Sequence, residues 1–376
     1  KMKQKIVFTQ DLKSKLFDTV RKLKPKKILF VTANKSYQKS DIQSFVNPII
    51  KNYSTKRFYE FDDNPKLKDV NKGINLLREY KADMIISIGG GSVIDMGKLI
   101  NILSQNTNSS DLIRKDLSLN KSKLKMIAIP TTSGTGSEST SFAVIYINNK
   151  KYSVSHKSMM PDYAFIDSNL SSSMNKKLRA SSAFDAFSQS IESYWSINST
   201  IESKKISKKA IQLIKNNIID SFNDNFKARA AMAKAANLSG QAINITKTTA
   251  PHALSYKISS KFGLQHGHSV ALTLGKFFIL NTPIHDINVI DRRGHKYLLK
   301  TMKSLCRLLK VASPYEAATY WYNLMKETGL EPDIVKACSL SKNDLQNIIL
   351  SVDQVRLKNN PVKINKIDMI QAFWEQ

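Results

Sequence analysis

Three of the chain's six histidines, His252, His266 and His268, fall within seventeen residues. Imidazole is a common ligand for borderline divalent metals, and a helix followed by a turn can bring such side chains together. A metal site is therefore the first functional hypothesis for this segment. The residues alone leave an alternative open, in which His252 is a buried histidine bonded to the backbone and His266 is an ordinary loop residue.

Two loops rich in glycine and hydroxyl side chains follow apolar, strand-like runs in the first half of the chain. The first loop contains Gly89, Gly90, Gly91 and Ser92 and leads into a helical pattern with Asp95. The second loop contains Thr131, Thr132, Ser133 and Thr135. Glycine lets a phosphate approach the main chain, where free N–H groups and a helix dipole stabilise its charge. A tight strand-to-helix turn also explains one such loop, but two at the carboxyl edge of one sheet predict a dinucleotide site.

The spacing of apolar residues changes character once along the chain. Short β-rich runs at 28–32, 84–88 and 126–130 alternate with helical stretches, which predicts a parallel sheet. Beyond residue 175, amphipathic patterns predict helices over 181–195, 202–219, 228–244, 297–311 and 315–328. We expect an α/β dinucleotide-binding domain over 1–175 and an all-helical metal- and substrate-binding domain over 176–376, meeting at a tight junction with a cleft.

Length and composition are those of a globular protein with about two domains. Of the 376 residues, 41% are apolar, yet no uncharged apolar run is long enough to span a bilayer. The N-terminal residues lack the apolar core of a signal peptide, so we expect a cytoplasmic protein. Cys306 and Cys338 belong to no metal or redox motif and are expected to be packing residues.

The formal net charge of +28 raises the question of nucleic-acid binding. Basic residues are, however, spread from Lys1 to Lys366 and mixed with acidic ones, without an arginine-rich arm or an aromatic platform. A lysine-rich solvated surface explains this distribution better. Such a positive field would raise the local concentration of a small anionic substrate.

Jointly, these motifs resemble the iron-containing, metal-dependent alcohol dehydrogenases, whose relatives include glycerol dehydrogenase and dehydroquinate synthase. The resemblance extends over nearly the full length, through the two loops, the Asp185 helix, the His252 and His266 elements and a tail at 356–361. It implies a Rossmann-like parallel-sheet dinucleotide-binding domain followed by a helical domain, the dehydroquinate synthase-like architecture, with a metal between them. The enzyme class implied is an NAD(P)-dependent alcohol dehydrogenase or aldehyde reductase.

The resemblance also implies four metal-ligand positions. They fall on Asp185, Gln189, His252 and His266, and the family's second ligand is a histidine where this chain has Gln189. Position i+4 shares a helical face with Asp185, but an amide oxygen is a weaker ligand than imidazole. We expect one divalent metal, Fe²⁺ or Zn²⁺. Without the histidines, Asp185 and Gln189 would be read as an ordinary exposed polar pair.

A narrower resemblance, through residues 185–200 and 252–274, is to the phosphonoacetaldehyde reductase branch, in which glutamine at the second ligand position is a familiar variant. It implies reduction of phosphonoacetaldehyde to 2-hydroxyethylphosphonate. Lys98, Arg179 and Arg356 are the candidate partners for the phosphonate, with arginine favoured for bidentate contacts. Each of the three could equally be a surface charge or a structural ion pair.

The mechanism implied is hydride transfer from a nicotinamide to an aldehyde whose oxygen is polarised by the metal. Many relatives carry a second histidine four residues after the His252 position, where this chain has Tyr256. The proton is expected to come from Tyr256 or through a water chain past His268, and the sequence does not choose between them.

Cofactor preference is predicted from the residues after the first core strand. Many NAD-preferring relatives have an aspartate there, which holds the ribose 2′-OH and repels a 2′-phosphate. This chain has Ala33, Asn34 and Lys35 instead. We therefore predict NADPH, with NADH as a second cofactor.

Other functions stay open at this stage. A general alcohol or diol dehydrogenase of the same family is the main alternative, and a lyase related to dehydroquinate synthase is disfavoured because its substrate-binding lysines are not evident. A basic nucleic-acid-binding protein that has lost its metal is a further alternative. Relatives are often dimers or larger homo-oligomers, and we expect the same here, with neither nucleic acid nor membrane as a partner.

Overall fold

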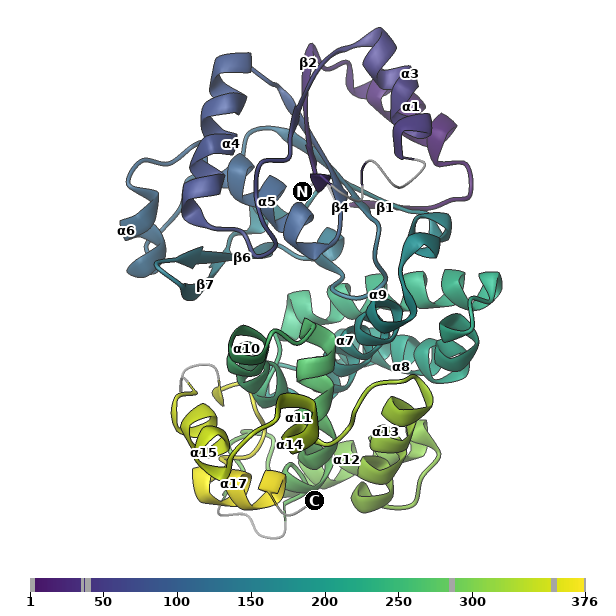
Figure 1. The fold of residues 1–376 in the computed structure, drawn as a ribbon, viewed down its shortest axis with the longest axis vertical. Coiled ribbons are helices and arrows are strands. Elements are labelled where there is room, and N and C mark those ends of the chain that lie inside the picture. Colours follow the sequence, from purple (N-terminus) through teal and green to yellow (C-terminus); the bar gives the residue numbers. More distant parts are fainter. Residues whose placement is uncertain (1–3, 35–36, 38–41, 284–287, 353–356, 375–376) are drawn as a thin grey trace. The chain divides into compact units, whose positions relative to one another are not determined.

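The computed structural model describes residues 4–34, 37, 42–283, 288–352 and 357–374. It divides into two compact units, Lys1–Ser173 and Met174–Gln376 (Figure 1). The first contains the sheet and the second is helical. That the first unit binds a nucleotide and the second a metal and a substrate stays a prediction.

A six-stranded parallel sheet in the order β1-β8-β5-β4-β2-β3 forms the centre of the first unit. Its strands are β1 (Lys5–Phe8), β2 (Lys27–Thr32), β3 (Ser54–Phe58), β4 (Met84–Gly89), β5 (Lys125–Pro130) and β8 (Tyr163–Ile166). The middle strand β4 is buried along its whole length, which explains why its sequence is apolar except at Ser87 and Gly89 and does not alternate. The predicted parallel sheet is confirmed.

Successive side chains of each strand point to opposite faces, so the sheet divides the first unit into two cores. On one face Ile28, Phe30 and Ile86 pack with α1 (Leu12–Leu23) and α3 (Ile42–Asn52). On the other face Leu29, Val31 and Ile85 pack with α4 (Leu67–Tyr80) and α5 (Gly91–Leu103). Figure 1 shows the two helix pairs on opposite sides of the sheet.

An antiparallel hairpin, which the expected parallel pattern did not include, also belongs to this unit. It consists of β6 (Phe142–Ile147) and β7 (Lys150–Ser155), joined at Asn148 and Asn149, both in the left-handed region (φ 50° and 61°). Asparagine tolerates that region better than most residues, which suits it to a two-residue turn. Alternate residues of β6 are buried against the α5 face of the sheet. The remaining elements are α6 (Ser109–Arg114), η1 (Ser137–Ser139), η2 (Lys157–Met159) and η3 (Ser168–Ser173).

The described part of the second unit is helical, with a single isolated bridge between Val289 and Val362. Its longest helices are α7 (Lys176–Trp195), α8 (Ile201–Phe222) and α9 (Phe226–Thr246). They are followed by α10 (Ala250–Phe262), α11 (His266–Leu280), α12 (His295–Leu309), α13 (Pro314–Glu327), α14 (Ile334–Cys338), α15 (Lys342–Leu350) and α17 (Lys366–Trp374). The predicted helical half is confirmed, and with it the fold class.

The core of the second unit is built around α7 and Trp321 of α13. The Trp321 ring lies 4.9 Å from that of Phe184 and 5.1 Å from that of Phe187, and its indole N–H donates to the Ala271 carbonyl of α11. Aromatic contacts of this kind add about 0.5–1.5 kcal/mol each to the free energy gained by burial. They fix α7 against α11 next to residue 185. Cys306 and Cys338 are buried free cysteines in the same core.

None of the helices in the described part of the chain combines the length and apolar character needed to cross a bilayer.

Candidate metal centre and nucleotide loops

Asp185, His252 and His266 converge in the second unit. Each offers one ligand atom, and these atoms all lie within 4.8 Å of one another. Asp185 Oδ1 lies 3.3 Å from His252 Nε2 and 3.8 Å from His266 Nε2. One carboxylate and two imidazoles are a donor set that suits Zn²⁺ or Fe²⁺. The three residues therefore fit the metal that the sequence predicted.

Asp185 and His252 are buried in this cluster, and neighbouring charged groups shift the pKa of each. The side chains of Asp185 and His252 are only 4% exposed, whereas that of His266 is 39% exposed. Burial alone would raise the pKa of Asp185, but His266 and His252 outweigh it and hold the pKa below its usual value. Burial likewise opposes the charged form of His252, yet Glu192 and Asp185 raise its pKa to about 9. A divalent cation would take the place of this positive charge.

Close packing of α11 on α7 brings His266 to Asp185. A Cβ atom on Gly267 would lie 1.8 Å from the Ser181 carbonyl oxygen and 3.0 Å from Asp185 Cβ. The His268 amide donates to the Ser181 hydroxyl at 3.1 Å, which fastens the same turn. Only glycine fits at this crossing, so residue 267 sets how near the first imidazole of α11 can come to α7.

Tyr256 lies on the exposed side of the cluster. Its ring stacks on that of His266, with centroids 5.9 Å apart and planes inclined by 6°. Tyr256 and His252 are four residues apart on α10, so both face the same way. The structure therefore brings the predicted proton donor next to the metal ligands.

His268, the other predicted catalytic residue, is not part of this cluster. Its Nε2 pairs with the Glu331 carbonyl oxygen at 2.8 Å, and burial lowers its pKa. The side chain is buried, and Nδ1 has no hydrogen-bond partner among the described residues. These contacts fix the start of α11 and provide no support for a proton path through His268.

Gln189 lies one turn after Asp185, as predicted, but presents its amide nitrogen to the cluster. Nε2 donates to Asp185 Oδ1 at 3.2 Å, and Oε1 accepts from the Ser239 hydroxyl at 2.9 Å. An N–H group cannot bind a metal, so the expected fourth ligand is not seen in this arrangement. Gln189 instead supports Asp185 as a neutral donor.

Glu192 is a functional candidate that the sequence reasoning missed. Its fully buried carboxylate accepts from the backbone N–H of Thr249 at 2.9 Å and from Nδ1 of His252. Asp185, Gln189 and Glu192 are spaced i, i+4 and i+7, which places all three on one face of α7. That spacing was the available signal.

The two predicted phosphate loops come together in the first unit. β4 and β5 are neighbouring strands with Gly89 opposite Pro130, and the Thr131 N–H donates to the Gly89 carbonyl at 3.0 Å. The residues that follow in the two loops are also adjacent. A Cβ atom added to Gly90 would lie 3.7 Å from the side chain of Thr132, and one added to Gly91 would lie 2.7 Å from that of Thr135. α5 begins at Gly91, directly after β4, so its N-terminal N–H groups lie beside the second loop.

Two residues predicted at ligand sites make structural contacts within the first unit. Lys98 is fully buried, and its ammonium donates to Ser137 and Thr140 hydroxyls and to the Phe142 carbonyl. Asp95 accepts from the Ser137 hydroxyl and from the Val144 N–H. Together they bind η1 and β6 to α5. The burial of Lys98 corrects the expectation that it meets a phosphonate, whereas a contact of Asp95 with the nucleotide stays a prediction.

Arg179 is also taken up by internal contacts. It is buried at the start of α7, pairs with Asp224 at 2.9 Å and donates to the Met174 carbonyl. The structural ion pair that the sequence left open is thus the observed arrangement, which corrects the expectation of a substrate contact. Arg356 and Lys35 lie outside the described residues. Ala33, after β2, is partly buried, and Asn34 is exposed.

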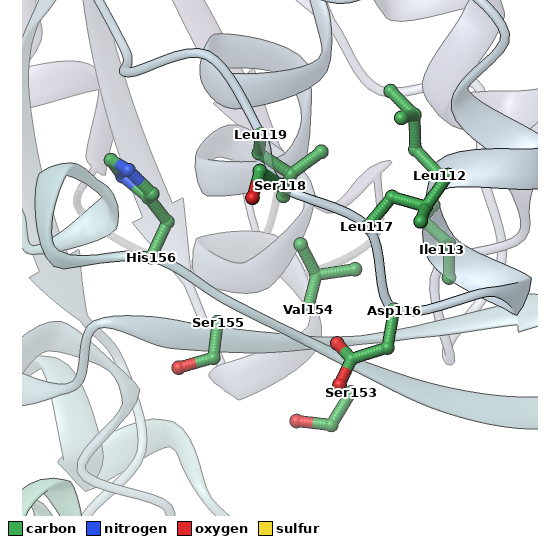
Figure 2. A pocket seen from close by; sticks show the side chains of 10 residues that line it. All are labelled: Leu112, Ile113, Asp116, Leu117, Ser118, Leu119, Ser153, Val154, Ser155 and His156. Carbon is green, nitrogen blue, oxygen red and sulfur yellow. The ribbon is translucent and has the colours of Figure 1, made fainter.

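A separate pocket of about 340 Å³ lies in the first unit between α6 and β7. Figure 2 shows Leu112 and Leu117 on one side and Val154 and His156 on the other. None of the predicted site residues that the structure describes lines this pocket. Its lining is a mixture of serines and aliphatic side chains, and His156 Nδ1 accepts from the Ser158 N–H at the start of η2.

A parallel-sheet unit with two paired glycine- and hydroxyl-rich loops and a helical unit with a carboxylate–imidazole cluster are the combination expected of a metal-dependent dehydrogenase. The model for iron-containing alcohol dehydrogenase matches residues 3–168, and that for the C-terminal part of the Fe-containing alcohol dehydrogenase family matches residues 179–375. The chain belongs to the iron-containing alcohol dehydrogenase family. The expected family and enzyme class are confirmed, and with them the family's cofactors, a nicotinamide nucleotide and a divalent metal.

Three relatives and one solved structure show the range of this similarity. The chain is 30% identical over 268 residues to phosphonoacetaldehyde reductase of Streptomyces viridochromogenes, covering 68% of the chain and 67% of that protein. It is 26% identical to NADPH-dependent butanol dehydrogenase of Clostridium saccharobutylicum, covering 95% and 93%. Aldehyde-alcohol dehydrogenase 2 of Entamoeba histolytica is 31% identical over 58% of the chain, and the match spans only 26% of that longer protein. Sulfoacetaldehyde reductase of Bifidobacterium kashiwanohense, solved with NAD⁺, has the same fold (TM-score 0.88, 22% identity, 100% and 97% coverage).

Replacing Gly267 with alanine should weaken both the fold and metal binding. The added methyl group collides with the Ser181 carbonyl, so α11 must move away from α7 and carry His266 with it. Overpacking of this kind typically costs about 1–3 kcal/mol. Thermal unfolding and Zn²⁺ binding of Gly267→Ala measure the two effects, with exposed Ser260→Ala as the control. Unchanged Zn²⁺ affinity would contradict this account of the helix crossing.

Replacing Gln189 with histidine should strengthen metal binding. The new imidazole starts one turn from Asp185 and adds a nitrogen ligand where the amide N–H now lies. We expect Zn²⁺ affinity to rise on the order of tenfold or more, measured by competition with a coloured chelator. Gln105→His, in the first unit, is the matched control for an added histidine. Equal affinity in Gln189→His would mean that Gln189 already supplies a ligand atom.

Proposed function

We propose that this chain is a metal-dependent reductase that converts a small aldehyde to a primary alcohol with NADPH or NADH. The first candidate reaction is the reduction of phosphonoacetaldehyde to 2-hydroxyethylphosphonate. The observation that carries the proposal is the convergence of Asp185, His252 and His266 on one point. The phosphonoacetaldehyde reductase relative, at 30% identity, supports the choice of substrate.

In this proposal Asp185, His252 and His266 hold Fe²⁺ or Zn²⁺, and Gln189 donates to Asp185 beside it. The bound metal supplies a Lewis acid for the oxygen of the aldehyde. The three side chains come from three helices whose mutual packing fixes them, so little reorganisation is needed when a ligand arrives. His266, with 39% of its side chain exposed, marks the open side of the centre.

The proposed nucleotide site is formed by the loops after β4 and β5. Gly89–Ser92 offers main-chain N–H groups to a diphosphate, and Thr131, Thr132, Ser133 and Thr135 offer hydroxyl groups beside them. No carboxylate follows β2 at Ala33, where an acid would repel a 2′-phosphate, so NADPH is the preferred cofactor in this proposal. The relative described as an NADPH-dependent butanol dehydrogenase supports that preference.

An anionic substrate suits the charge of the chain. The net charge of +28 draws small anions toward the protein whatever residue finally binds them. Because Lys98 and Arg179 are engaged in structural contacts, Arg356 is the proposed phosphonate partner that remains from the sequence prediction.

The proton for the product alcohol is assigned to Tyr256. Its ring lies against His266 and on the same face of α10 as His252, so the phenol is near the place where an aldehyde oxygen would lie. A positioned donor of this kind typically contributes about 10²–10⁴-fold to the rate.

A general alcohol dehydrogenase of the same family is the second candidate. The similarity to butanol dehydrogenase covers 95% of the chain, whereas the similarity to phosphonoacetaldehyde reductase covers 68%. The two functions share the metal and the nucleotide and differ only in the substrate.

The purified, metal-loaded protein should oxidise NADPH when phosphonoacetaldehyde is added. We expect kcat/KM for this aldehyde to exceed that for butanal, since only the former carries the dianionic group that the positive field attracts. A chelator should abolish turnover, and added Fe²⁺ or Zn²⁺ should restore it. Rates are followed by the loss of NADPH absorbance.

The controls separate substrate, cofactor and metal. Asp185→Asn should be inactive with every aldehyde because the centre loses its carboxylate. Ala33→Asp should lower kcat/KM with NADPH and spare that with NADH. Preference for butanal would favour the general dehydrogenase, and turnover that survives both chelation and Asp185→Asn would refute the metal-dependent mechanism.

Replacing Tyr256 with phenylalanine should lower kcat about 100-fold while leaving Zn²⁺ affinity unchanged. Phenylalanine keeps the ring stacked on His266 and removes only the hydroxyl. The exposed Tyr315→Phe serves as the matched control. Full turnover in Tyr256→Phe would remove the phenol from the proton path.

A further inference from the structure

Glu192 is a carboxylate with no exposed surface in the core of the second unit. The four hydrogen bonds that it accepts from described residues all come from one short segment, the start of α10. Its Oε1 accepts from the Thr249 N–H at 2.9 Å, the Thr249 hydroxyl at 3.0 Å and the His252 N–H at 3.3 Å, and its Oε2 accepts from His252 Nδ1.

The first part of this arrangement is a helix cap supplied from another helix. Thr249, the N-cap residue of α10, makes no side-chain capping bond of its own. The main-chain donors that the first turn leaves unpaired are taken up by Oε1 of Glu192 instead. This cap would be needed whether or not the protein bound a metal.

The second part concerns only the imidazole of His252. Because Oε2 accepts the proton of Nδ1, the lone pair of the neutral ring lies on Nε2, and Nε2 is the atom 3.3 Å from Asp185 Oδ1. A carboxylate behind a histidine ligand fixes the tautomer and orientation of the ring and increases its strength as a ligand. The cap alone gives no reason for this contact.

We propose that Glu192 is a positioning residue of the metal centre, which sets the His252 ring so that Nε2 is the atom offered to the metal. The inference rests on the proposed function and adds to it a second carboxylate from α7. Asp185 and Glu192 lie seven residues apart on that helix. One helix thus holds the ligand carboxylate on one side of the imidazole and the orienting carboxylate on the other.

Glutamine at position 192 separates the two roles. Its carbonyl oxygen can take the place of Oε1 and keep the cap, since the three donors there exclude an NH₂ group. The NH₂ group then faces Nδ1 and needs a lone pair there, which moves the ring proton to Nε2. Glu192→Gln should therefore preserve the helix start and block the ligand atom.

Thr249→Val is the matched variant for the cap. It removes one donor to Glu192 and leaves the Trp195 indole N–H, which now donates to the Thr249 hydroxyl, without that acceptor. The contact between Glu192 and the His252 ring stays in place. This variant should lose thermal stability and keep its affinity for metal.

The experiment measures Zn²⁺ affinity by chelator competition and the visible spectrum of bound Co²⁺ in the full chain and both variants. We expect Glu192→Gln to bind Zn²⁺ about 10–100-fold more weakly and to alter the Co²⁺ bands, while Thr249→Val does neither. Equal affinities in the full chain and Glu192→Gln would overturn the positioning role and leave the proposed function intact. Failure of the unsubstituted protein to bind either metal would overturn both.

Discussion

The contact between Glu192 and His252 is the interaction on which the arrangement of the second unit's centre depends. It joins two side chains with almost no exposure, whose remaining polar atoms are paired with Thr249 and Asp185. The same carboxylate holds the first turn of α10, so helix position and ring orientation are set together. The other two residues of the centre lie around the ring of His252. Asp185 faces its Nε2, and α11 brings His266 close to α7 where the two helices cross at Gly267.

The proposed nucleotide site of the first unit is built from different chemical groups. The loops proposed to bind the nucleotide offer main-chain groups and small hydroxyls, and the charged residues behind them hold the loops in place. Lys98 and Asp95 illustrate this, because both turn inward to η1 and β6. A buried ammonium with several acceptors stiffens the loop that it holds. In the proposed function, the first unit recognises phosphate and the second binds the metal.

Much of the fold could be predicted from the sequence because it depends on the periodicity of apolar residues along the chain. The runs at 84–88 and 126–130 predicted strands of one parallel sheet. The resemblance to the family, rather than spacing alone, placed Asp185 with His252 and His266 in one centre. The predictions that failed concern the direction in which individual side chains point, and sequence patterns do not contain this information. Lys98 and Arg179 were assigned by residue type and proved to be internal. Glu192 was overlooked because an acidic residue in a helix normally indicates a solvated face, whereas here α7 is buried nearly throughout.

The geometry of the centre links metal binding to the stability of the folded protein. Its two imidazoles come from the hairpin of α10 and α11, turned at Gly263, and its carboxylate comes from α7, far earlier in the chain. A cation bound by all three side chains would therefore connect α10 and α11 to α7, and only the folded protein brings these ligands together. Scarcity of metal would first loosen the hairpin and expose it to proteases, so the abundance of the protein should follow the metal supply of its surroundings.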